Sequence, residues 1–365
     1  MLAYEKIVFI QTVELVSKCI SVILLVFALY LGLGLFSVVT INSLVILSAQ
    51  LLKLYLIHGK LGVGCDFSFY DKEVLQNIGT FSLWATVSTI ADKFFFPIIP
   101  IILAAVSNTT QVAVFAIIAA IEGYVLTIAR ALNGIFLPKV MSHVVAKSDK
   151  EIITSMMIKV GRMQLYIVGM IIFAFFAFGR DFINYWVGSA FDSAYIGLFF
   201  VLVPCLFHLT MGIAEELVLA ENKVKYRALI YVSGSVVNVI MIFILSPKLG
   251  AIGAAVAVFF AFVSAYNILA AIIYRNKFGI NILRFFRECH LSIIPCFLVV
   301  FIFFLSVNHF WLTTTLCGLL IKIVFCVIVG YIILWVFTMN KEEKEIILSF
   351  IPNKLSYEKE KSSNC

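Results

Sequence analysis

Long apolar stretches recur along almost the whole chain, and they constrain its fold more than any other feature. Each is about 20 residues long, the length that a helix needs to cross the hydrocarbon core of a bilayer. Hydrophobic residues make up 63% of the 365 residues and charged residues only 13%, a balance that excludes an ordinary soluble domain. The sequence therefore predicts an all-α, polytopic integral membrane helix bundle. We expect about ten transmembrane helices, at roughly 8–31, 34–57, 79–106, 109–137, 161–179, 193–220, 226–246, 250–274, 291–308 and 313–339.

The basic residues gather in alternate connections between these stretches. With the N-terminus inside, these connections are 1–7, 58–78, 138–160, 221–225, 275–290 and the tail from Asn340. The opposite loops hold only Arg180 and Lys248. This asymmetry predicts that both termini lie in the cytoplasm, and it explains the net charge of +7 without a nucleic-acid partner. The segment 138–160 is mildly amphipathic, so it is either a helix at the cytoplasmic interface or a plain basic loop.

The stretch 79–106 carries Asp92 and Lys93 at its middle, followed by Pro97 and Pro100. Charges at the bilayer centre cost roughly 2.5–3.5 kcal/mol each unless they face a bundle interior or a wet cavity. Counted from the turn at 107–109, Glu122 on the next stretch has a similar depth. We therefore expect a Lys93–Glu122 pair or an Asp92–Lys93–Glu122 cluster. It would either line a substrate or ion path or only fix helix register.

Proline at position 97 leaves the Lys93 carbonyl without its helical donor. A free carbonyl beside Asp92 could coordinate a cation or a water molecule.

Five more ionisable or aromatic residues are candidates for a functional role. Arg130 suits a phosphate, or else snorkels to headgroups. Glu215 could bind a proton, or could lie in a solvated inner mouth. Lys18 has the i,i+4 spacing for an ion pair with Glu14. Lys322 could touch lipid phosphate or snorkel, and Trp186 suits the membrane interface. The eight cysteines lack metal-ligand spacing, so neither a metal nor a disulfide is expected.

Two hairpins of the chain echo each other. VSKCISVILLVFALYLGLGLFSVV begins at Val16, and VSGSVVNVIMIFILSPKLGAIGAAVAV begins at Val232. Each places a Leu-Gly turn at a similar distance from its Val-Ser. Internal repeats of this kind are typical of transporters, and this one predicts that four helices of an earlier unit precede residue 1.

Several short motifs resemble, in order and spacing, those of bacterial polysaccharide flippases, the O-antigen and teichoic-acid exporters of the multidrug/oligosaccharidyl-lipid/polysaccharide superfamily. They are Tyr4-Glu5-Lys6 with Phe9, Asp92, Phe136-Leu137-Pro138, Gly179-Arg180-Asp181-Phe182-Ile183 with Trp186-Val187-Gly188 and Ala194-Tyr195, Leu219-Ala220-Glu221-Asn222-Lys223 with Asn238, and Leu249-Gly250-Ala251-Ile252-Gly253-Ala254-Ala255.

The resemblance implies helices five to fourteen of a two-lobed fold with an incomplete first lobe. Residues 1–57 would end the N-terminal lobe, and 58–78 would be a cytoplasmic linker. Residues 79–274 would form a six-helix C-terminal lobe, 291–339 two extra helices and 340–365 a polar cytoplasmic tail.

The implied function is a non-enzymatic one. The protein would flip an undecaprenyl-diphosphate-linked oligosaccharide across the bacterial cytoplasmic membrane by alternating access. Partners would be that substrate, membrane lipids and polysaccharide assembly machinery. No Walker motif is present, so no cofactor is expected, and a proton or sodium ion could couple transport. The alternatives are a cation-coupled drug exporter of the same superfamily, or a membrane-embedded glycan polymerase or acyltransferase.

Overall fold

The computed structural model describes residues 7–32, 34–61, 71–145 and 149–349, and helices form almost all of them. No strand occurs within these ranges. Seven helical stretches among the residues described are long and apolar enough to cross a membrane. The ten predicted stretches map onto these seven together with the first helix, the interrupted stretch 79–106 and the second half of Val224–Phe278. The predicted all-α membrane bundle is therefore confirmed.

The chain divides into two compact units, residues 1–76 and 77–365. Three sequence features fall outside the described residues: the Tyr4-Glu5-Lys6 motif, positions 62–70 of the predicted linker and the tail from residue 350.

The first unit contains a hairpin of α1 (Ile7–Tyr30) and α2 (Leu35–Leu61). Gly32, with φ of +73°, lies in the turn between the two helices. Antiparallel packing brings Lys53 of α2 opposite Glu14, and its Nζ donates to the Glu14 carboxylate over 2.9 Å. The expected Glu14–Lys18 pair is therefore wrong: a cross-helix partner outcompetes the one four residues away, and Lys18 stays exposed.

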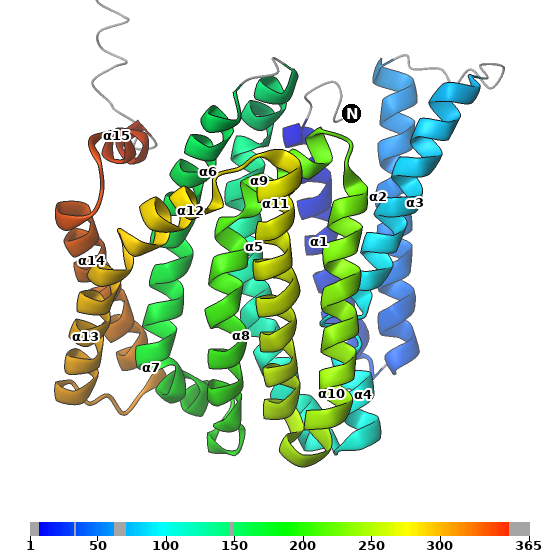
Figure 1. Ribbon diagram of the computed structural model, residues 1–365. Helices are drawn as coiled ribbons and strands as arrows, with labels where there is room; N and C mark the ends of the chain where they lie inside the picture. The colour runs from blue at the N-terminus through cyan, green and yellow to red at the C-terminus, as the bar shows by residue number, and fades with distance from the viewer. Residues whose placement is uncertain (1–6, 33, 62–70, 146–148, 350–365) are drawn as a thin grey trace, which may run out of the picture. The chain divides into compact units, whose positions relative to one another are not determined.

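The second unit begins within α3 and continues to the end of the chain (Figure 1). In chain order its elements are α3 (Lys72–Lys93), α4 (Ile99–Val106), α5 (Thr109–Val145), α6 (Lys150–Gln164), η2 (Leu165–Gly169), α7 (Met170–Trp186), η3 (Ser189–Phe191), α8 (Ser193–Thr210), α9 (Gly212–Ala220), α10 (Val224–Ala261), η4 (Phe262–Leu269), α11 (Ala270–Phe278), α12 (Ile282–Phe285), η5 (Phe286–Leu291), α13 (Ile294–Phe310), α14 (Leu316–Phe337) and α15 (Lys341–Ser349).

The stretch 79–106 is broken where its prolines predict a kink. Helix α3 ends at Lys93, a turn follows, and α4 begins at Ile99 with Pro100 in its first turn. Polar side chains of α10 bind the carbonyls exposed near the break: the Ser235 hydroxyl lies 2.5 Å from the Ala91 oxygen, and Asn238 Nδ2 donates to the Phe95 oxygen over 2.8 Å. The Ala91 oxygen also accepts from the Phe94 N–H over 3.0 Å, whereas Asn238 supplies the Phe95 oxygen with a donor that the membrane would not provide.

Helix α10 reverses direction at Gly250, whose φ of 57° and ψ of −132° are non-helical. A Cβ there would lie 2.3 Å from the Gln111 side chain, so only glycine fits. The Gln111 Oε1 in turn accepts a hydrogen bond from the Ala251 N–H over 2.8 Å. This reversal makes two antiparallel helices of the predicted stretches 226–246 and 250–274.

The segment 138–160 is neither an interfacial helix nor a plain loop. Helix α5 extends to Val145, and α6 begins at Lys150 and continues through η2 into α7 as one 37-residue apolar stretch. Met156 and Val160 belong to the buried core. Val140 is buried as well, whereas Ile152 is 46% exposed, so most of the apolar residues that made this segment look amphipathic pack inside the bundle.

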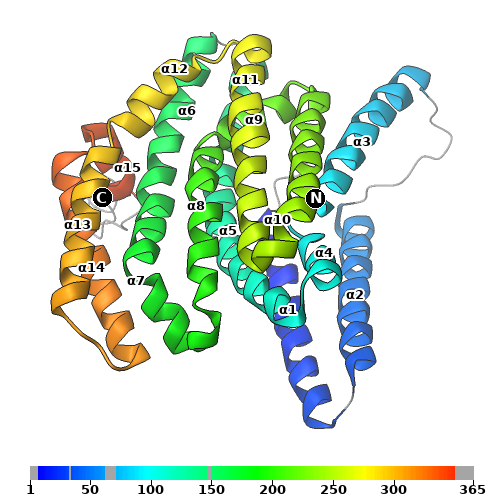
Figure 2. The ribbon, with the colours of Figure 1, turned by 60° about the horizontal axis from the view of Figure 1, so that its bottom comes forward.

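Helices α13 and α14 pack against α7 and against each other, and both views show them along one edge of the second unit (Figures 1 and 2). Lys322 of α14 is only 1% exposed, so neither of the two predicted alternatives, contact with lipid phosphate or snorkelling, holds. Its Nζ donates to Asn308 Oδ1 over 2.6 Å and to the Trp311 carbonyl over 3.1 Å. Lys322 therefore joins α14 to α13, where neutral acceptors replace headgroups.

Candidate functional site

A polar cavity lies inside the second unit between α3, α5, α8, α9 and α10. It consists of two adjoining pockets of about 340 and 400 Å³ that share Arg130, Leu219, Arg227 and Tyr231. The first pocket also contains Asn133, His208, Glu215 and Glu216, and the second contains Ser88, Thr89 and Asp92. Hereafter these two pockets are called the polar cavity. A polar volume of this size within an apolar bundle indicates a ligand or ion path.

Helix α3 supplies the wall that carries Asp92. Ala85, Ser88, Thr89 and Asp92 follow helical spacing and line the cavity together. The hydroxyls of Ser88 and Thr89 donate to backbone oxygens one turn earlier, over 2.9 Å each. Asp92 is half-buried and forms no hydrogen bond or ion pair with the described residues. Its carboxylate is therefore available to solvent or a ligand in the cavity.

An ion pair between α9 and α10 forms the opposite wall. Arg227 Nε lies 2.9 Å from Glu215 Oε1, and the Tyr231 hydroxyl donates to the same oxygen over 2.9 Å. The Arg227 guanidinium also lies 5.1 Å from the Tyr231 ring centroid, within cation–π range. These contacts lock Glu215 between two α10 side chains, so Arg227 brings its own counter-ion to the cavity.

Arg130 of α5 differs from Arg227. It lines both pockets and is exposed, and it forms neither a hydrogen bond nor an ion pair with any described residue. A guanidinium offers five donors in a planar fork that matches phosphate and carboxylate. Arg130 thus presents unused donors to the cavity, and an anion is the ligand that they suit.

Close packing holds the segment of α5 that follows Arg130. Gln164 of α6, which is fully buried, donates from Nε2 to Asn133 Oδ1 over 2.6 Å and to the Ala129 carbonyl over 3.3 Å. Gly212 leaves room on the other side, since a Cβ there would lie 2.0 Å from Asn133 Nδ2. The backbone around Arg130 is therefore fixed while its guanidinium is not.

The structure brings together three of the residues that the sequence singled out. Asp92, Arg130 and Glu215 line the polar cavity, whereas Glu122 lines neither pocket and is only 5% exposed. The expected Lys93–Glu122 contact is wrong: Lys93 is exposed at the end of α3 and forms no ion pair among the described residues. The break before Pro97 ends the helix at Lys93, so depth counted along a continuous helix does not apply.

Sequence reasoning missed Arg227 and Tyr231. Arg227 follows the predicted inside connection 221–225 by two residues and therefore resembles one more loop charge. A usable signal was present, because Glu215 and Arg227 flank the same short turn and antiparallel helices bring such residues together.

Trp186, predicted at the interface, is 46% exposed at the end of α7 and packs on Phe182 with ring centroids 5.6 Å apart.

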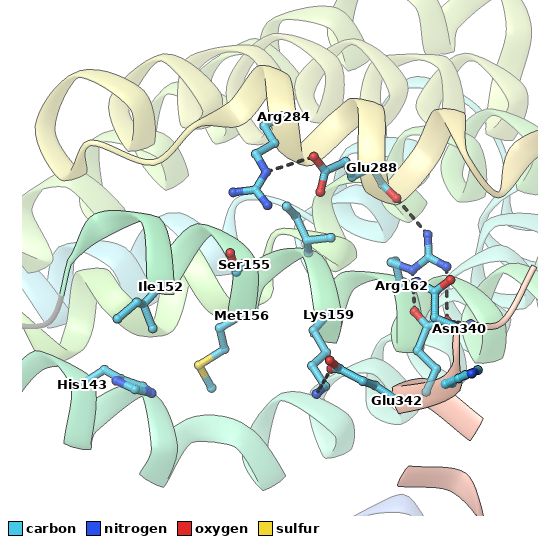
Figure 3. Close-up of a pocket in the computed structure, with 13 residues that line it drawn as sticks. His143, Ile152, Ser155, Met156, Lys159, Arg162, Arg284, Glu288, Asn340 and Glu342 are labelled. Carbon is cyan, nitrogen blue, oxygen red and sulfur yellow. Dashed lines mark hydrogen bonds and ion pairs between the residues drawn. The ribbon is translucent and has the colours of Figure 1, made fainter. Parts of the chain in front are cut away.

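A further cavity of about 540 Å³ lies between α5, α6, η5 and α15 (Figure 3). Its cations are largely committed to carboxylates of the chain: Arg162 to Glu343, Lys159 to Glu342 and Arg284 to Glu288. Arg162 is 7% exposed and Glu343 is 4% exposed. The first two pairs attach α15 to α6, and the third joins α12 to η5. Together they leave this cavity with less unpaired charge than the polar cavity.

The fold and the cavity define a class, a polytopic helix bundle with a polar interior. Among solved structures, the chain is similar to the lipid II flippase MurJ in its inward closed conformation, with a TM-score of 0.57 and 15% sequence identity. The match covers 88% of this chain and 66% of that one, so the chain spans just under two thirds of the flippase's length. No family model and no curated protein matches the sequence.

Proposed function

We propose that the protein flips a lipid-linked oligosaccharide across the bacterial cytoplasmic membrane by alternating access. The observation that carries this proposal is the unpaired Arg130 guanidinium in a polar cavity of a membrane bundle. A guanidinium that faces a polar cavity with its donors unused suits a diphosphate. The likeness to a lipid II flippase supports a lipid-linked substrate, and the motif resemblance favours an undecaprenyl-diphosphate carrier of an O-antigen or capsule unit.

The charged and polar residues of the cavity have different roles in this proposal. Arg130 binds the diphosphate, while Asp92, Asn133 and the backbone-bonded hydroxyls of α3 face the sugar hydroxyls. Glu215 neutralises Arg227 at 2.9 Å, so the two together add polarity without a second strong anion site. The lipid chain remains in the bilayer, as it must for a substrate far larger than the cavity.

The proposed orientation places both termini in the cytoplasm, because the basic connections lie on that side. Single cysteines introduced at Lys225 and Arg180 test it with a membrane-impermeant thiol reagent in intact cells, on a background from which the native cysteines have been removed. Labelling of the Arg180 site alone agrees with the proposal, and labelling of the Lys225 site alone reverses it. In this orientation, enzymes that deliver the saccharide and enzymes that polymerise it would act on opposite faces of the membrane.

A leaflet-translocation assay tests the function directly. The purified full chain is placed in vesicles with a fluorescent undecaprenyl-diphosphate oligosaccharide in one leaflet, and quenching from outside measures its movement. We expect translocation by the unaltered protein and loss of it in Arg130→Ala. The matched control is Arg287→Ala, which removes a highly exposed arginine outside the cavity. A folded protein that moves no lipid, or that moves a small organic cation instead, contradicts the proposal and favours a drug exporter.

A further inference from the structure

The α1–α2 hairpin contains a polar groove that the proposed diphosphate binding does not use. The groove has a volume of about 390 Å³ and lies wholly within the first unit. Its polar residues on α1 follow the spacing of one helix face: Glu14, Ser17, Lys18 and Ser21. Those on α2 also share one face: Asn42, Gln50 and Lys53. Two polar helix faces therefore meet along this groove, which is called the hairpin groove below.

Contacts between the two helices close the hairpin groove at both ends. At one end the Lys53 Nζ donates to Glu14 Oε1 over 2.9 Å, and at the other the Ser21 hydroxyl donates to Asn42 Oδ1 over 3.4 Å. Lys18 and Gln50 lie between these two contacts along their helices. Both are exposed, and neither forms a hydrogen bond or an ion pair with a described residue. The groove thus has fixed ends and unused hydrogen-bond donors between them.

The position of Lys18 does not suit a lipid headgroup. It lies halfway between Ile7 and Tyr30, the ends of α1, and is roughly 17 Å from each end at 1.5 Å per residue. A lysine side chain is much shorter than that distance, so its ammonium stays away from the ends of the helix, where headgroups lie. An unpaired cation at mid-membrane is costly unless a polar group meets it there. The groove therefore suits a polar group that crosses the membrane.

The charges of the hairpin groove indicate the chemistry of that group. Lys53, whose side chain is 14% exposed, neutralises Glu14, and Lys18 remains as one excess positive charge. The side-chain amides of Asn42 and Gln50 can each donate to and accept from hydroxyl groups. A groove of this volume is in the size range of small-molecule sites. One cation among neutral amides matches a sugar that has several hydroxyls and one negative charge.

We propose that the hairpin groove is a saccharide subsite that binds an acidic sugar of the lipid-linked oligosaccharide. Lys18 binds the sugar's anionic group, and Asn42 and Gln50 bind its hydroxyls. This inference rests on the proposed function and names the class of substrate, an oligosaccharide that contains a uronic acid or another sugar with one negative charge. The polar cavity of the second unit binds the diphosphate, and the hairpin groove recognises the saccharide.

Binding measurements on the full chain in nanodiscs test the subsite with three probes. The first is a soluble prenyl diphosphate, the second carries a neutral diglucose, and the third carries a glucuronyl-glucose, in which a carboxylate replaces one hydroxymethyl group. A charge-assisted hydrogen bond should make the acidic probe bind roughly 10- to 100-fold more tightly than the neutral one.

Variants then locate the preference for the acidic probe. Lys18→Gln should abolish it and leave the affinity for the neutral probe unchanged, whereas Lys18→Arg should keep it. Gln50→Leu should weaken binding of both saccharide probes and leave the bare prenyl diphosphate unaffected. Lys248→Gln, which removes an exposed lysine of α10 that lines neither the hairpin groove nor the polar cavity, is the matched control and should behave like the unaltered protein.

The outcomes separate this inference from the proposed function. Equal affinity of the unaltered protein for the acidic and neutral probes overturns the subsite alone, because the diphosphate still binds. A preference for the acidic probe that persists in Lys18→Gln also overturns it, because the anion is then bound elsewhere. A folded protein that binds none of the three probes overturns both proposals. If Lys18→Gln fails to fold, Gln50→Leu decides: unchanged affinity for both saccharide probes means that the groove packs against another helix, and overturns the inference.

Discussion

Two arginines of the second unit, Arg162 and Arg130, have opposite surroundings. Every guanidinium nitrogen of Arg162 donates: Nε binds Glu343, Nη1 binds the Glu288 carbonyl and the Ser292 hydroxyl over 2.9 and 2.8 Å, and Nη2 binds Tyr166, the Thr338 carbonyl and Glu343. Arg130 is exposed to its cavity and binds no described residue. Arg162 stabilises the packed bundle, whereas the hydrogen-bond donors of Arg130 are free to bind a ligand that enters the polar cavity.

The difference shows that the role of a cationic side chain inside a membrane protein depends on whether its hydrogen-bond donors are already used, and not on how deeply it is buried. Burying Arg162 is tolerable because its fork is fully paired. Arg130 avoids the desolvation cost by facing a polar volume of several hundred Å³. The comparison predicts that Arg162 substitutions act on stability and Arg130 substitutions act on ligand binding.

The largest effect should come from Arg162→Ala. It leaves Glu343 as a buried carboxylate without a counter-ion, and breaking such a pair costs about 3–5 kcal/mol. Thermal unfolding of the detergent-solubilised protein measures the change, and Arg130→Ala under the same conditions should change the free energy of unfolding by less than about 0.5 kcal/mol. Equal destabilisation by the two substitutions would contradict the division between them.

The double variant Arg162→Met, Glu343→Leu sharpens the same test. Replacing both partners by apolar side chains of similar volume removes the uncompensated charge, so most of the loss should be recovered. A double variant as unstable as Arg162→Ala would mean that Tyr166, Ser292 and the backbone acceptors carry the interaction.

The next effect is on binding, in Arg130→Gln. A charge-assisted hydrogen bond contributes about 1.5–3 kcal/mol, so the affinity for a prenyl diphosphate should fall about 10- to 100-fold with unfolding unaltered. The lower bound applies if water or Arg227 replaces part of the contact. Arg287→Gln, an exposed arginine on η5, controls for the loss of a positive charge. Unchanged affinity in Arg130→Gln would remove the support for a phosphate site.

The fold could largely be predicted from the sequence, because apolar stretches of membrane length impose helices whatever packs against them. The reversal at Gly250 and the break before Pro97 follow from residues with unusual backbone freedom or constraint. What failed depended on tertiary packing. Glu14 prefers Lys53 across the hairpin, over 2.9 Å, to Lys18 on its own helix, and nothing in local spacing reveals that choice.

The candidate site could be predicted only in part for the same reason. Asp92 and Arg130 stand out because a charge in an apolar stretch needs an explanation. Arg227 lies next to a basic connection, so in the sequence it resembles one more loop charge. The turn between α9 and α10 brings it to Glu215. Lys322 shows the converse: an isolated cation in an apolar stretch suggested lipid, yet the carbonyls of Asn308 and Trp311 satisfy it inside the bundle.

A smaller effect is expected from Tyr231→Phe. This change removes the hydroxyl that donates to Glu215 over 2.9 Å but keeps the ring against Arg227. One hydrogen bond contributes about 0.5–1.5 kcal/mol, so stability should fall by that amount while diphosphate affinity changes less than in Arg130→Gln. A larger loss of affinity in Tyr231→Phe than in Arg130→Gln would mean that the wall of the cavity, not its free cation, holds the anion.

The smallest effect should come from Lys159→Gln, which tests the paired cavity at its edge. Lys159 donates to Glu342 over 3.0 Å, one helical turn from Arg162, but the two side chains are 40% and 77% exposed. Exposed pairs contribute about 0.2–1 kcal/mol because solvent screens them and both side chains lose freedom. Unfolding in low salt should therefore shift slightly, and the shift should shrink as salt is added, whereas the loss in Arg162→Ala should persist because the buried pair is screened far less. A salt-insensitive loss in Lys159→Gln that equals the loss in Arg162→Ala would show that α15 is held by both pairs as one network, not by the buried arginine alone.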